Sequence, residues 1–231
     1  MLTLEKLEIV LDGFTLNADF TLEQGRNLAL IGPSGAGKST LLNVIAGFLR
    51  PRSGRVLWQG EDITDLPPGQ RPISMLFQDN NLFPHLTVTQ NIGLGIRPDL
   101  RLNAAERAYL HDALERVGLA GMAGRKPGQL SGGQQSRVAL ARVLVQRKPL
   151  VLLDEPFSAL GPALKHDMLR LVGDLMQEIG GTMIMVSHEP EDAQMIADVT
   201  SVVAQGTVTA PKPTAALFEN PPKVLRDYLG T

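Results

Sequence analysis

The most constraining feature of this 231-residue chain is a glycine-rich loop at residues 32–40, with the sequence Gly-Pro-Ser-Gly-Ala-Gly-Lys-Ser-Thr. An apolar run, residues 28–31, precedes it, and a segment of helical character, residues 41–48, follows it. Small residues let successive backbone N–H groups curve around a phosphate, and the N-terminus of the following helix adds a positive dipole. Lys38 is suited to reach the β- and γ-phosphates, and the Ser39 hydroxyl to bind Mg²⁺. The pattern predicts a strand, a phosphate-binding loop and a helix, with a nucleoside triphosphate as ligand.

The composition is that of an ordinary globular protein, because 43% of the residues are apolar and 20% are charged. The net charge of −2 gives no electrostatic reason to bind nucleic acid or anionic lipid, so we expect no nucleic-acid partner. The chain has no cysteine, which excludes disulfides, thiolate nucleophiles and cysteine zinc sites. Its apolar runs are far shorter than the roughly 20 residues that span a bilayer. Glu5, Glu8 and Asp12 stand where a signal peptide needs an apolar run, so we expect a cytoplasmic protein.

Strand-like and helix-like segments alternate along the chain, which predicts an α/β fold. The expected strands are residues 2–10, 27–31, 55–58, 73–77, 150–154, 182–186 and 201–204. The expected helices are residues 38–48, 104–117, 132–146, 162–179 and 190–196. Several strand segments lack polar alternation, as parallel strands buried on both faces do. The helical stretch from about 88 to 122 interrupts the alternation, and we expect it to be an inserted subdomain.

Two features near the ends of segments add detail to this expectation. Asn103 followed by Glu106 three residues later has the pattern of a helix capping box, and Gly180 with Gly181 marks a helix end. Gln205 and Gly206 have the pattern of a tight turn between short strands, and only about twenty residues follow it. We expect no C-terminal regulatory domain.

A pair of carboxylates, Asp154 and Glu155, directly follows the apolar run 150–153. A buried strand would deliver the pair to the C-terminal edge of the sheet, where open α/β sheets bind ligands. There Asp154 would hold Mg²⁺ through water, and Glu155 would accept a proton from the attacking water or orient it. By itself this pair is weak evidence for a catalytic site, because solvated carboxylates in loops are commoner than catalytic ones.

A third motif, Leu-Ser-Gly-Gly-Gln-Gln at residues 130–135, leads into the expected helix 132–146, with Ser131 as its N-cap. In combination with the other motifs it resembles the signature sequence of the ATP-binding cassette (ABC) family. The resemblance covers essentially the whole chain, because Gln78 follows an expected strand and His188 follows another in the family order. It implies a P-loop NTPase sheet domain with an N-terminal antiparallel β subdomain. It also implies a single ABC ATPase domain over residues 1–231, with a helical signature subdomain inserted at about 88–140.

The resemblance implies an ATPase that uses ATP and Mg²⁺ and in which two cassettes pair head to tail around the nucleotide. The implied ATP-binding residues are Gly32, Pro33, Ser34, Gly35, Ala36, Gly37, Lys38, Ser39 and Thr40 of one copy and Ser131, Gly132, Gly133 and Gln134 of the other. The implied catalytic residues are Lys38, Gln78, Glu155 and His188, and the implied Mg²⁺ ligands are Ser39, Gln78 and Asp154. A lone histidine is more often structural, but the place of His188 after a parallel strand favours a hydrogen bond to the γ-phosphate.

Residues 75–88, with the pairing of segments 80–83 and 90–95, resemble ATP-binding subunits of bacterial importers, most closely those for thiamine. The implied partners are a second copy, a transmembrane permease and, indirectly, a periplasmic solute-binding protein. The implied location is the cytoplasmic face of the bacterial inner membrane, as a peripheral protein. The cassette does not touch the solute, so polyamine, iron(III) and sulfate importers stay open. Leu82, Phe83 and Leu86 form either local core or a groove for the permease.

Rivals to this interpretation belong to other classes. A soluble ABC ATPase acting on nucleic acid or the ribosome usually carries a long coiled-coil insertion or a second cassette, and this chain has neither. A non-hydrolysing scaffold is disfavoured because Lys38, Glu155 and His188 are all present. An exporter subunit is the nearest rival, and identification of the membrane partner separates it from an importer.

The chain departs from the family pattern at two positions. Gly161 stands where the family usually has an aspartate that contacts the opposing copy, so communication between the two ATP sites is in doubt. Leu11 stands where an aromatic residue usually stacks on adenine, and Phe14 is the nearest replacement. Stacking of a base on an aromatic ring contributes about 1–3 kcal/mol, so we expect weaker ATP binding with intact phosphate chemistry.

Overall fold

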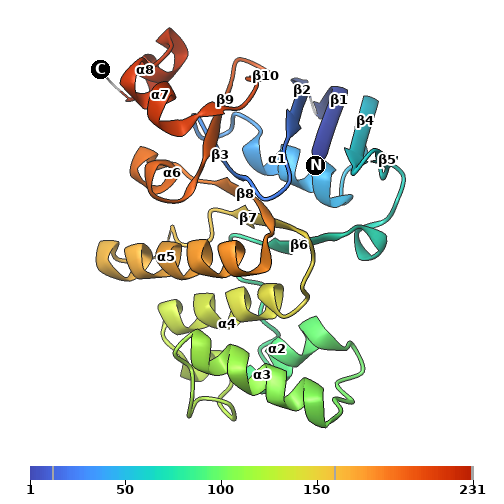
Figure 1. The fold of residues 1–231 in the computed structure, drawn as a ribbon, viewed down its shortest axis with the longest axis vertical. Coiled ribbons are helices and arrows are strands. Elements are labelled where there is room, and N and C mark those ends of the chain that lie inside the picture. The colour runs from blue at the N-terminus through green and yellow to red at the C-terminus, as the bar shows by residue number, and fades with distance from the viewer. Residues whose placement is uncertain (12, 159, 230–231) are drawn as a thin grey trace.

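The computed structural model describes residues 1–11, 13–158 and 160–229, and one curled sheet runs through them (Figure 1). The strand order is β5-β4-β1-β2-β10-β9-β3-β8-β7-β6, with β11 beside β9. The strands are β1 (Leu2–Leu11), β2 (Phe14–Leu22), β3 (Asn27–Ile31), β4 (Ser53–Trp58), β5 (Glu61–Asp62), β6 (Ile73–Leu76), β7 (Leu150–Asp154), β8 (Thr182–Val186), β9 (Val199–Ala204), β10 (Thr207–Val208) and β11 (Lys212–Pro213).

The helices follow the predicted alternation with strands. They are α1 (Lys38–Ala46), α2 (Val88–Ile96), α3 (Ala104–Arg116), α4 (Gly132–Leu144), α5 (Pro162–Ile179), α6 (Pro190–Ile196), α7 (Thr214–Glu219) and α8 (Lys223–Leu229). Short 3₁₀ turns lie at Pro68–Gln70 and Pro127–Gln129. The capping box of Asn103 and Glu106 is present at α3, and Gly180 ends α5 in the left-handed region, as predicted. None of the helices in the described part of the chain is long and apolar enough to cross a membrane.

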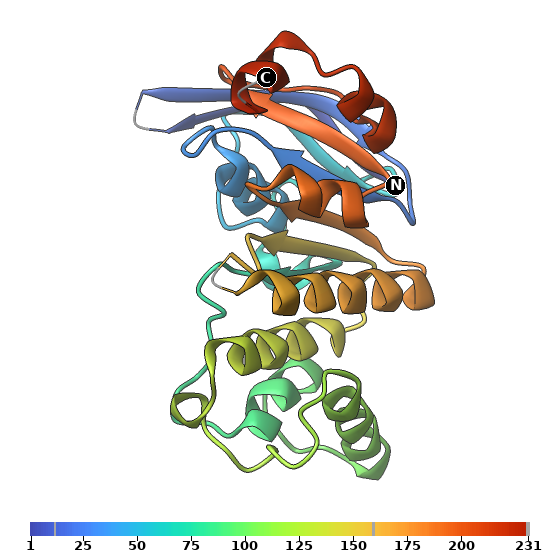
Figure 2. The ribbon, with the colours of Figure 1, turned by 90° about the vertical axis from the view of Figure 1, so that its left-hand side faces the viewer.

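The N-terminal layer is antiparallel, as predicted, because β2 and β4 both pair antiparallel with β1. The strand β2 is not among the expected strands, and its residues alternate between exposed and buried as in a sheet with one solvated face. The buried face packs on α1, where Leu41, Leu42 and Ile45 are completely buried. Figure 2 shows this layer above α1, which therefore lies between the two halves of the curled sheet.

The central strands β9, β3, β8, β7 and β6 are parallel to their neighbours in this order. Every residue of β7 and β8 is buried, which fits the predicted runs without polar alternation. Packing of α4 and α5 against these strands forms a second apolar cluster. The α/β class predicted from the alternation of segments is confirmed.

A separate apolar cluster joins α2, α3 and α4 at one end of the molecule (Figure 1). Helix α4 belongs to two clusters, because Val138 and Ala141 face α2 and α3 while Leu140 and Val143 face the central sheet. The boundary at about residue 140 stays a prediction, since a shared helix has no single edge.

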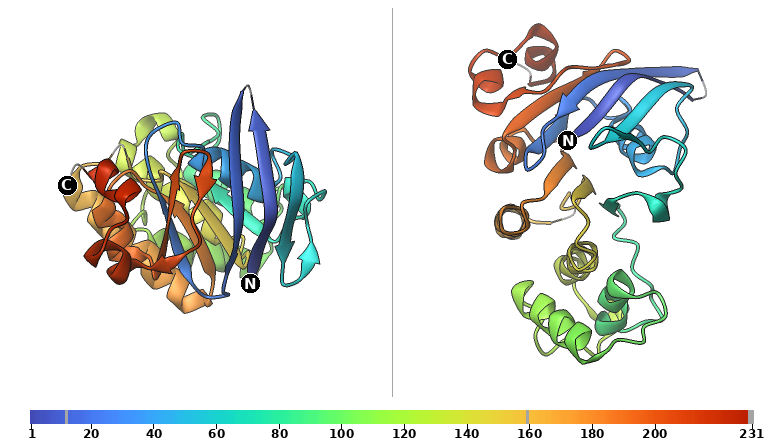
Figure 3. Two further views of the ribbon diagram at one scale, coloured as in Figure 1. Left: turned by 90° about the horizontal axis from the view of Figure 1, so that it is seen from above. Right: turned by 45° about the vertical axis from the view of Figure 1, so that its right-hand side comes forward.

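Helices α7 and α8 lie at the opposite end from α2 and α3 (Figures 1 and 3). Leu217 of α7 and the fully buried Leu225 of α8 pack with β3, β9 and α6. Neither helix is among the expected helices, because each is too short, at six and seven residues, to show a clear helical periodicity.

Candidate functional site

The register of the parallel strands brings four loops to one edge of the sheet. Leu30 of β3 pairs with Val186 of β8, and Leu76 of β6 pairs with Leu153 of β7. The strands therefore end at nearly the same level, and the segments that follow them carry the phosphate loop, Gln78, the Asp154–Glu155 pair and His188. The signature motif at residues 130–135 instead leads into α4. This is the edge at which open α/β sheets bind ligands.

The phosphate loop is shaped by two close approaches of its backbone to other elements. Gly32 has φ of 149°, and a Cβ there would lie 2.1 Å from the carbonyl oxygen of Val203. Gly37 has φ of 96°, and a Cβ there would lie 2.6 Å from the Phe14 ring. Both positions require glycine, since a side chain would collide with β9 or with β2. The loop thus turns tightly into the N-terminus of α1, which ends at Gly47 in a left-handed cap.

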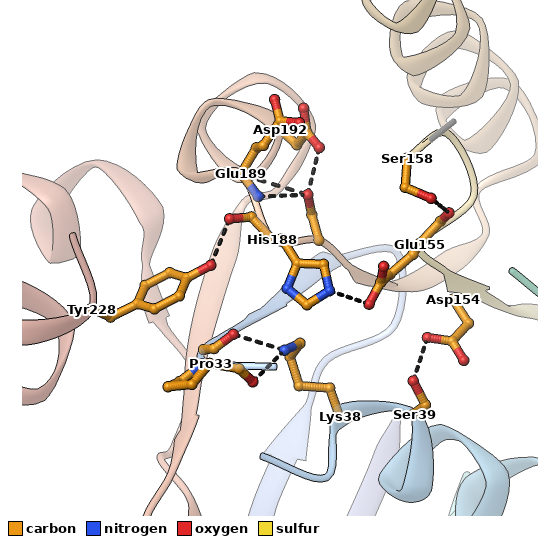
Figure 4. A network of polar contacts seen from close by, with 12 residues as sticks. Pro33, Lys38, Ser39, Asp154, Glu155, Ser158, His188, Glu189, Asp192 and Tyr228 are labelled. Carbon is orange, nitrogen blue, oxygen red and sulfur yellow. Dashed lines mark hydrogen bonds and ion pairs between the residues drawn. The ribbon is translucent and has the colours of Figure 1, made fainter. Parts of the chain in front are cut away.

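Lys38 points back into its own loop and is almost completely buried, with 4% of its surface exposed. Its ammonium group donates hydrogen bonds to the carbonyl oxygens of Gly32 at 2.7 Å and of Pro33 at 2.8 Å (Figure 4). Burial lowers the pKa of Lys38, and the negative charges of Glu155 and Asp154 oppose this shift. The loop therefore holds a desolvated cation where a phosphate would approach.

Asp154 at the end of β7 accepts a hydrogen bond from the Ser39 hydroxyl at 2.8 Å. Burial raises the pKa of the Asp154 carboxyl, whereas the Ser39 hydrogen bond lowers it. The two side chains present a hydroxyl and a carboxylate oxygen side by side, and hard oxygen ligands are those that Mg²⁺ prefers. The donor set fits the predicted metal.

Glu155 takes a left-handed backbone conformation, with φ of 47°, directly after β7. Its N–H donates to the Val186 carbonyl at 3.2 Å, so the turn is tied to the neighbouring strand. The carboxylate contacts Nε2 of His188, and only 13% of the side chain is exposed. Such a conformation costs a non-glycine residue about 1–3 kcal/mol and persists where the surroundings fix it, most often at functional sites. Here it turns Glu155 toward the loop after β8.

A network of polar contacts holds the loop that carries His188. Ser187 donates to Asp192 at 2.5 Å, and Lys165 of α5 pairs with Asp192 at 2.9 Å and with Glu189 at 2.6 Å. The phenol of Tyr228 donates to the His188 carbonyl at 2.5 Å (Figure 4). These supporting residues are not among the predicted site residues, because no local sequence pattern relates α5 or α8 to the loop after β8.

Other predicted site residues lie outside this network. Gln78 follows β6 at the same edge but is exposed, and its side chain makes no hydrogen bond within the part of the chain that the structure describes. Ser131 caps α4 and forms a reciprocal capping box with Gln134. Helix α4 packs both on α2 and α3 and on the central sheet, and the hydrogen bonds between Ser131 and Gln134 lie within the cap itself. The roles of these residues in ATP binding stay predictions.

Leu11 and Gly161 are the two positions at which the chain departs from the family pattern. Leu11 is 37% exposed near the tip of the β1–β2 hairpin, and Phe14 packs its ring against Gly37. Gly161 caps α5 ahead of Pro162, and a Cβ added at Gly161 would meet nothing within 4 Å. The predicted helix start is confirmed, and room exists there for a larger side chain.

The chain belongs to the ABC transporter family, whose sequence profile matches residues 15–158. Two solved dimers of the bacterial-type cassette MJ0796 have the same fold, and one of them is a post-hydrolysis state bound to ADP and phosphate. Their TM-scores are 0.82 and 0.80 at 29% and 30% sequence identity, and each comparison covers 93% of this chain and 99% of the other. The fold class and the ABC ATPase assignment predicted from the motifs are confirmed.

Among curated relatives, proteins named thiamine import ATP-binding protein ThiQ match over nearly the whole chain. That of Cereibacter sphaeroides is 60% identical over 230 residues, and that of Ruegeria sp. is 57% identical over 230 residues, each covering 100% of both chains. That of Escherichia coli K12 is 52% identical over 208 residues, covering 90% of both chains.

Proposed function

We propose that this chain is the ATP-hydrolysing subunit of a bacterial thiamine importer. The single observation that carries the choice of solute is its 60% identity, over the full length of both chains, to a thiamine import ATP-binding protein. The convergence of Lys38, Ser39, Asp154, Glu155 and His188 at one sheet edge supports the hydrolytic part of the proposal.

In this proposal the backbone N–H groups of residues 32–40 and the ammonium group of Lys38 bind the phosphates. These donors act together with the N-terminus of α1, which favours negative charge. Ser39, Asp154 and Gln78 would hold Mg²⁺, which supplies neutralisation of the charge that develops on the phosphates. The energetic cost of burying Lys38 is then offset by its pairing with phosphate oxygens.

Glu155 is the residue that accepts the proton of the attacking water in this mechanism. His188 contacts the Glu155 carboxylate through Nε2, and in this proposal its ring would also donate to the γ-phosphate when ATP is bound. The contact between His188 and Glu155 lies within one chain. The backbone N–H groups at the start of α4 would cover the phosphates from a second copy, with Ser131, Gly132, Gly133 and Gln134 at the interface.

The pairing of two copies also explains why the signature motif lies apart from the phosphate loop in one chain. We infer a head-to-tail homodimer that ATP completes, seated on a transmembrane permease at the cytoplasmic face of the inner membrane. A periplasmic solute-binding protein would act on the permease and not on this chain. Because ATP itself forms part of the interface, the chain without nucleotide should be largely monomeric.

The experiment that tests the solute is uptake in cells that lack the gene. Cells complemented with the wild-type chain should regain accumulation of radiolabelled thiamine, whereas cells complemented with a Glu155→Gln chain should not. Restored uptake of a polyamine, of iron(III) or of sulfate without thiamine would reject thiamine and keep the importer. Loss of thiamine efflux instead of uptake would point to an exporter.

The loop between β6 and α2 offers an exposed aromatic side chain for the permease. Asn91, which is completely buried, accepts from the Phe83 N–H at 2.8 Å and donates to the Phe83 carbonyl at 3.1 Å. The backbone of Phe83 is thus fixed while its side chain is 45% exposed, with the Arg142 guanidinium 5.8 Å from the ring centroid. Leu82 instead packs into two apolar clusters. Phe83 is therefore the better candidate for contact with the permease, and the partly buried Leu82 is the better candidate for local packing.

We expect Phe83→Asp to abolish co-purification with the permease and thiamine uptake, because a charge replaces the exposed ring at the proposed contact. Nucleotide affinity should stay within about twofold, and stability within about 0.5 kcal/mol, as for an exposed substitution. Ile179→Asp is the matched control, since Ile179 is also 45% exposed but lies at the end of α5. Continued uptake by the Phe83→Asp chain would reject this contact. Leu82→Asp should also lose uptake, but with a clear loss of stability.

We expect Gly161→Asp to raise the Hill coefficient of ATP hydrolysis, because an aspartate there would reach the opposing copy in the proposed dimer. Stability should rise by a few tenths of a kcal/mol, since aspartate is a better N-cap than glycine and the site has room for it. Gly161→Asn is the matched control, because it caps the helix without a charge. ATP-dependence curves of the assembled transporter measure the effect. Equal Hill coefficients for all three proteins would show that Gly161 does not limit communication between the sites.

A further inference from the structure

Tyr228 lies at the C-terminal end of the chain yet contacts the centre of the hydrolytic site. Helix α8 is anchored by Leu225, which is completely buried, and it contacts β9. From this helix the Tyr228 ring packs at the edge of an apolar cluster and its hydroxyl donates to the His188 carbonyl at 2.5 Å. Figure 4 shows the phenol approaching His188 from the side opposite to Glu155.

The orientation of the His188 ring depends on its backbone. The ring is 38% exposed, and its polar contact within residues 1–11, 13–158 and 160–229 is with Glu155. The preceding residue, Ser187, is fixed by its backbone and by its side chain. Its N–H donates to the Leu30 carbonyl, and its hydroxyl donates to Asp192. The peptide group that follows His188 is held on both sides, because the Glu189 N–H donates to the Ser187 hydroxyl oxygen at 3.1 Å and the Tyr228 hydroxyl donates to the His188 carbonyl. A partly buried carbonyl outside a strand or helix needs such a donor, or the peptide group turns to find another.

We infer that Tyr228 is a positioning residue for ATP hydrolysis, which holds the peptide group of His188 so that its ring stays on Glu155. This inference rests on the proposed function, and it adds a residue from α8 to the hydrolytic machinery. Tyr228 acts in this role through the main chain, because its hydroxyl donates to the His188 carbonyl. In this inference the docking of α8 on β9 sets the geometry of a side chain in the loop after β8, 40 positions earlier in the sequence.

The surroundings of the phenol keep it a donor. Burial raises the pKa of Tyr228, and the negative charges of Glu155 and Glu189 raise it further. The neutral phenol, which carries the donated proton, is thereby stabilised against the phenolate. The hydrogen bond to His188 persists over the whole neutral pH range.

The test compares Tyr228→Phe with Tyr109→Phe, because the chain has two tyrosines and each change removes one hydroxyl. Tyr109 lies on α3 with the Arg147 guanidinium 4.1 Å from its ring centroid, and phenylalanine keeps that contact. A net hydrogen bond contributes about 0.5–1.5 kcal/mol, so we expect Tyr228→Phe to lower kcat by about 2- to 12-fold. The KM for MgATP should stay within about twofold, because the phosphate loop is unchanged. Tyr109→Phe should match the wild type in both constants.

A double-mutant cycle separates positioning of His188 from a general structural effect. In a His188→Ala chain, studied by single-turnover hydrolysis with enzyme in excess, the added Tyr228→Phe change should have no further effect. The same fold loss in both backgrounds, or a kcat of Tyr228→Phe equal to that of Tyr109→Phe, would overturn the inference.

A second measurement does not depend on hydrolysis. In the Tyr109→Phe chain Tyr228 is the only tyrosine, so the pH titration of tyrosinate absorbance reports on it alone. Titration above the ordinary tyrosine pKa in the folded protein would show that the phenol is buried beside Glu155 and Glu189, as the contact requires, and titration at the ordinary value would reject the contact. A wild-type chain that binds but does not hydrolyse ATP would reject the proposed function, while this titration would still test the contact.

Discussion

Replacing Glu155 with glutamine should abolish steady-state ATP hydrolysis and leave ATP binding intact. The amide is nearly isosteric with the carboxylate but cannot accept the proton of water, and loss of a general base typically lowers the rate by about 100- to 10,000-fold. The contact with His188 Nε2 can persist through the amide oxygen, so the site keeps its shape. Because hydrolysis no longer opens the dimer, ATP should hold two copies together. Phosphate release and size-exclusion chromatography with ATP measure the two effects.

The matched control for this change is Glu178→Gln. Glu178 accepts two hydrogen bonds from Arg116, at 2.6 and 3.0 Å, on the exposed surface at the end of α5. Exposed ion pairs contribute little, so this variant should hydrolyse ATP as the wild type does. Turnover of Glu155→Gln within about threefold of the wild type, measured with the cognate permease, would show that Glu155 is not the base.

The central part of this fold could be predicted because its signals are local. The bounds of β3, β7, β8, α5 and α6 agree with the sequence prediction, since each is an apolar run or periodic segment between glycine or proline residues. Parallel strand order then delivers Lys38, Asp154, Glu155 and His188 to one edge. The motif spacing and the topology of the parallel sheet both place these residues at the same edge.

The remaining parts depend on contacts between distant segments. The strand β2 alternates between apolar and polar residues, but Asn17 and Asp19 on its exposed face are residue types that are depleted in strands, so its composition did not indicate a strand. The Tyr228 hydroxyl bonds to His188 across 40 positions of sequence, and Lys165 bonds to Asp192 across two elements. Neither partnership leaves a periodic or spaced pattern in the sequence. The left-handed turn at Glu155 is likewise fixed by its bond to Val186 and not by the identity of the residue.

Replacing Lys38 with methionine should remove most ATP binding with little change in the stability of the nucleotide-free chain. A hydrogen bond to a charged group contributes about 1.5–3 kcal/mol, so loss of the ammonium group should weaken MgATP binding by about 10- to 150-fold. Two effects on folding oppose each other. The variant loses the bonds to Gly32 and Pro33, but it also loses a cation whose pKa is lowered by burial and whose charged form is therefore less stable in the fold than in the unfolded chain.

Thermal unfolding without MgATP measures the stability of the nucleotide-free chain, and the gain in stability on adding MgATP measures binding. At an ATP concentration about 100 times the wild-type Kd, the wild type gains about 2.7 kcal/mol of stability, whereas a variant that binds 100-fold more weakly gains about 0.4 kcal/mol. Lys212→Met is the matched control, because Lys212 is exposed on β11, and it should keep the full gain. An undiminished gain in the Lys38→Met chain would mean that the backbone N–H groups and the N-terminus of α1 carry phosphate binding without the lysine. In that case the burial of Lys38 against its own loop would serve the fold and not the nucleotide.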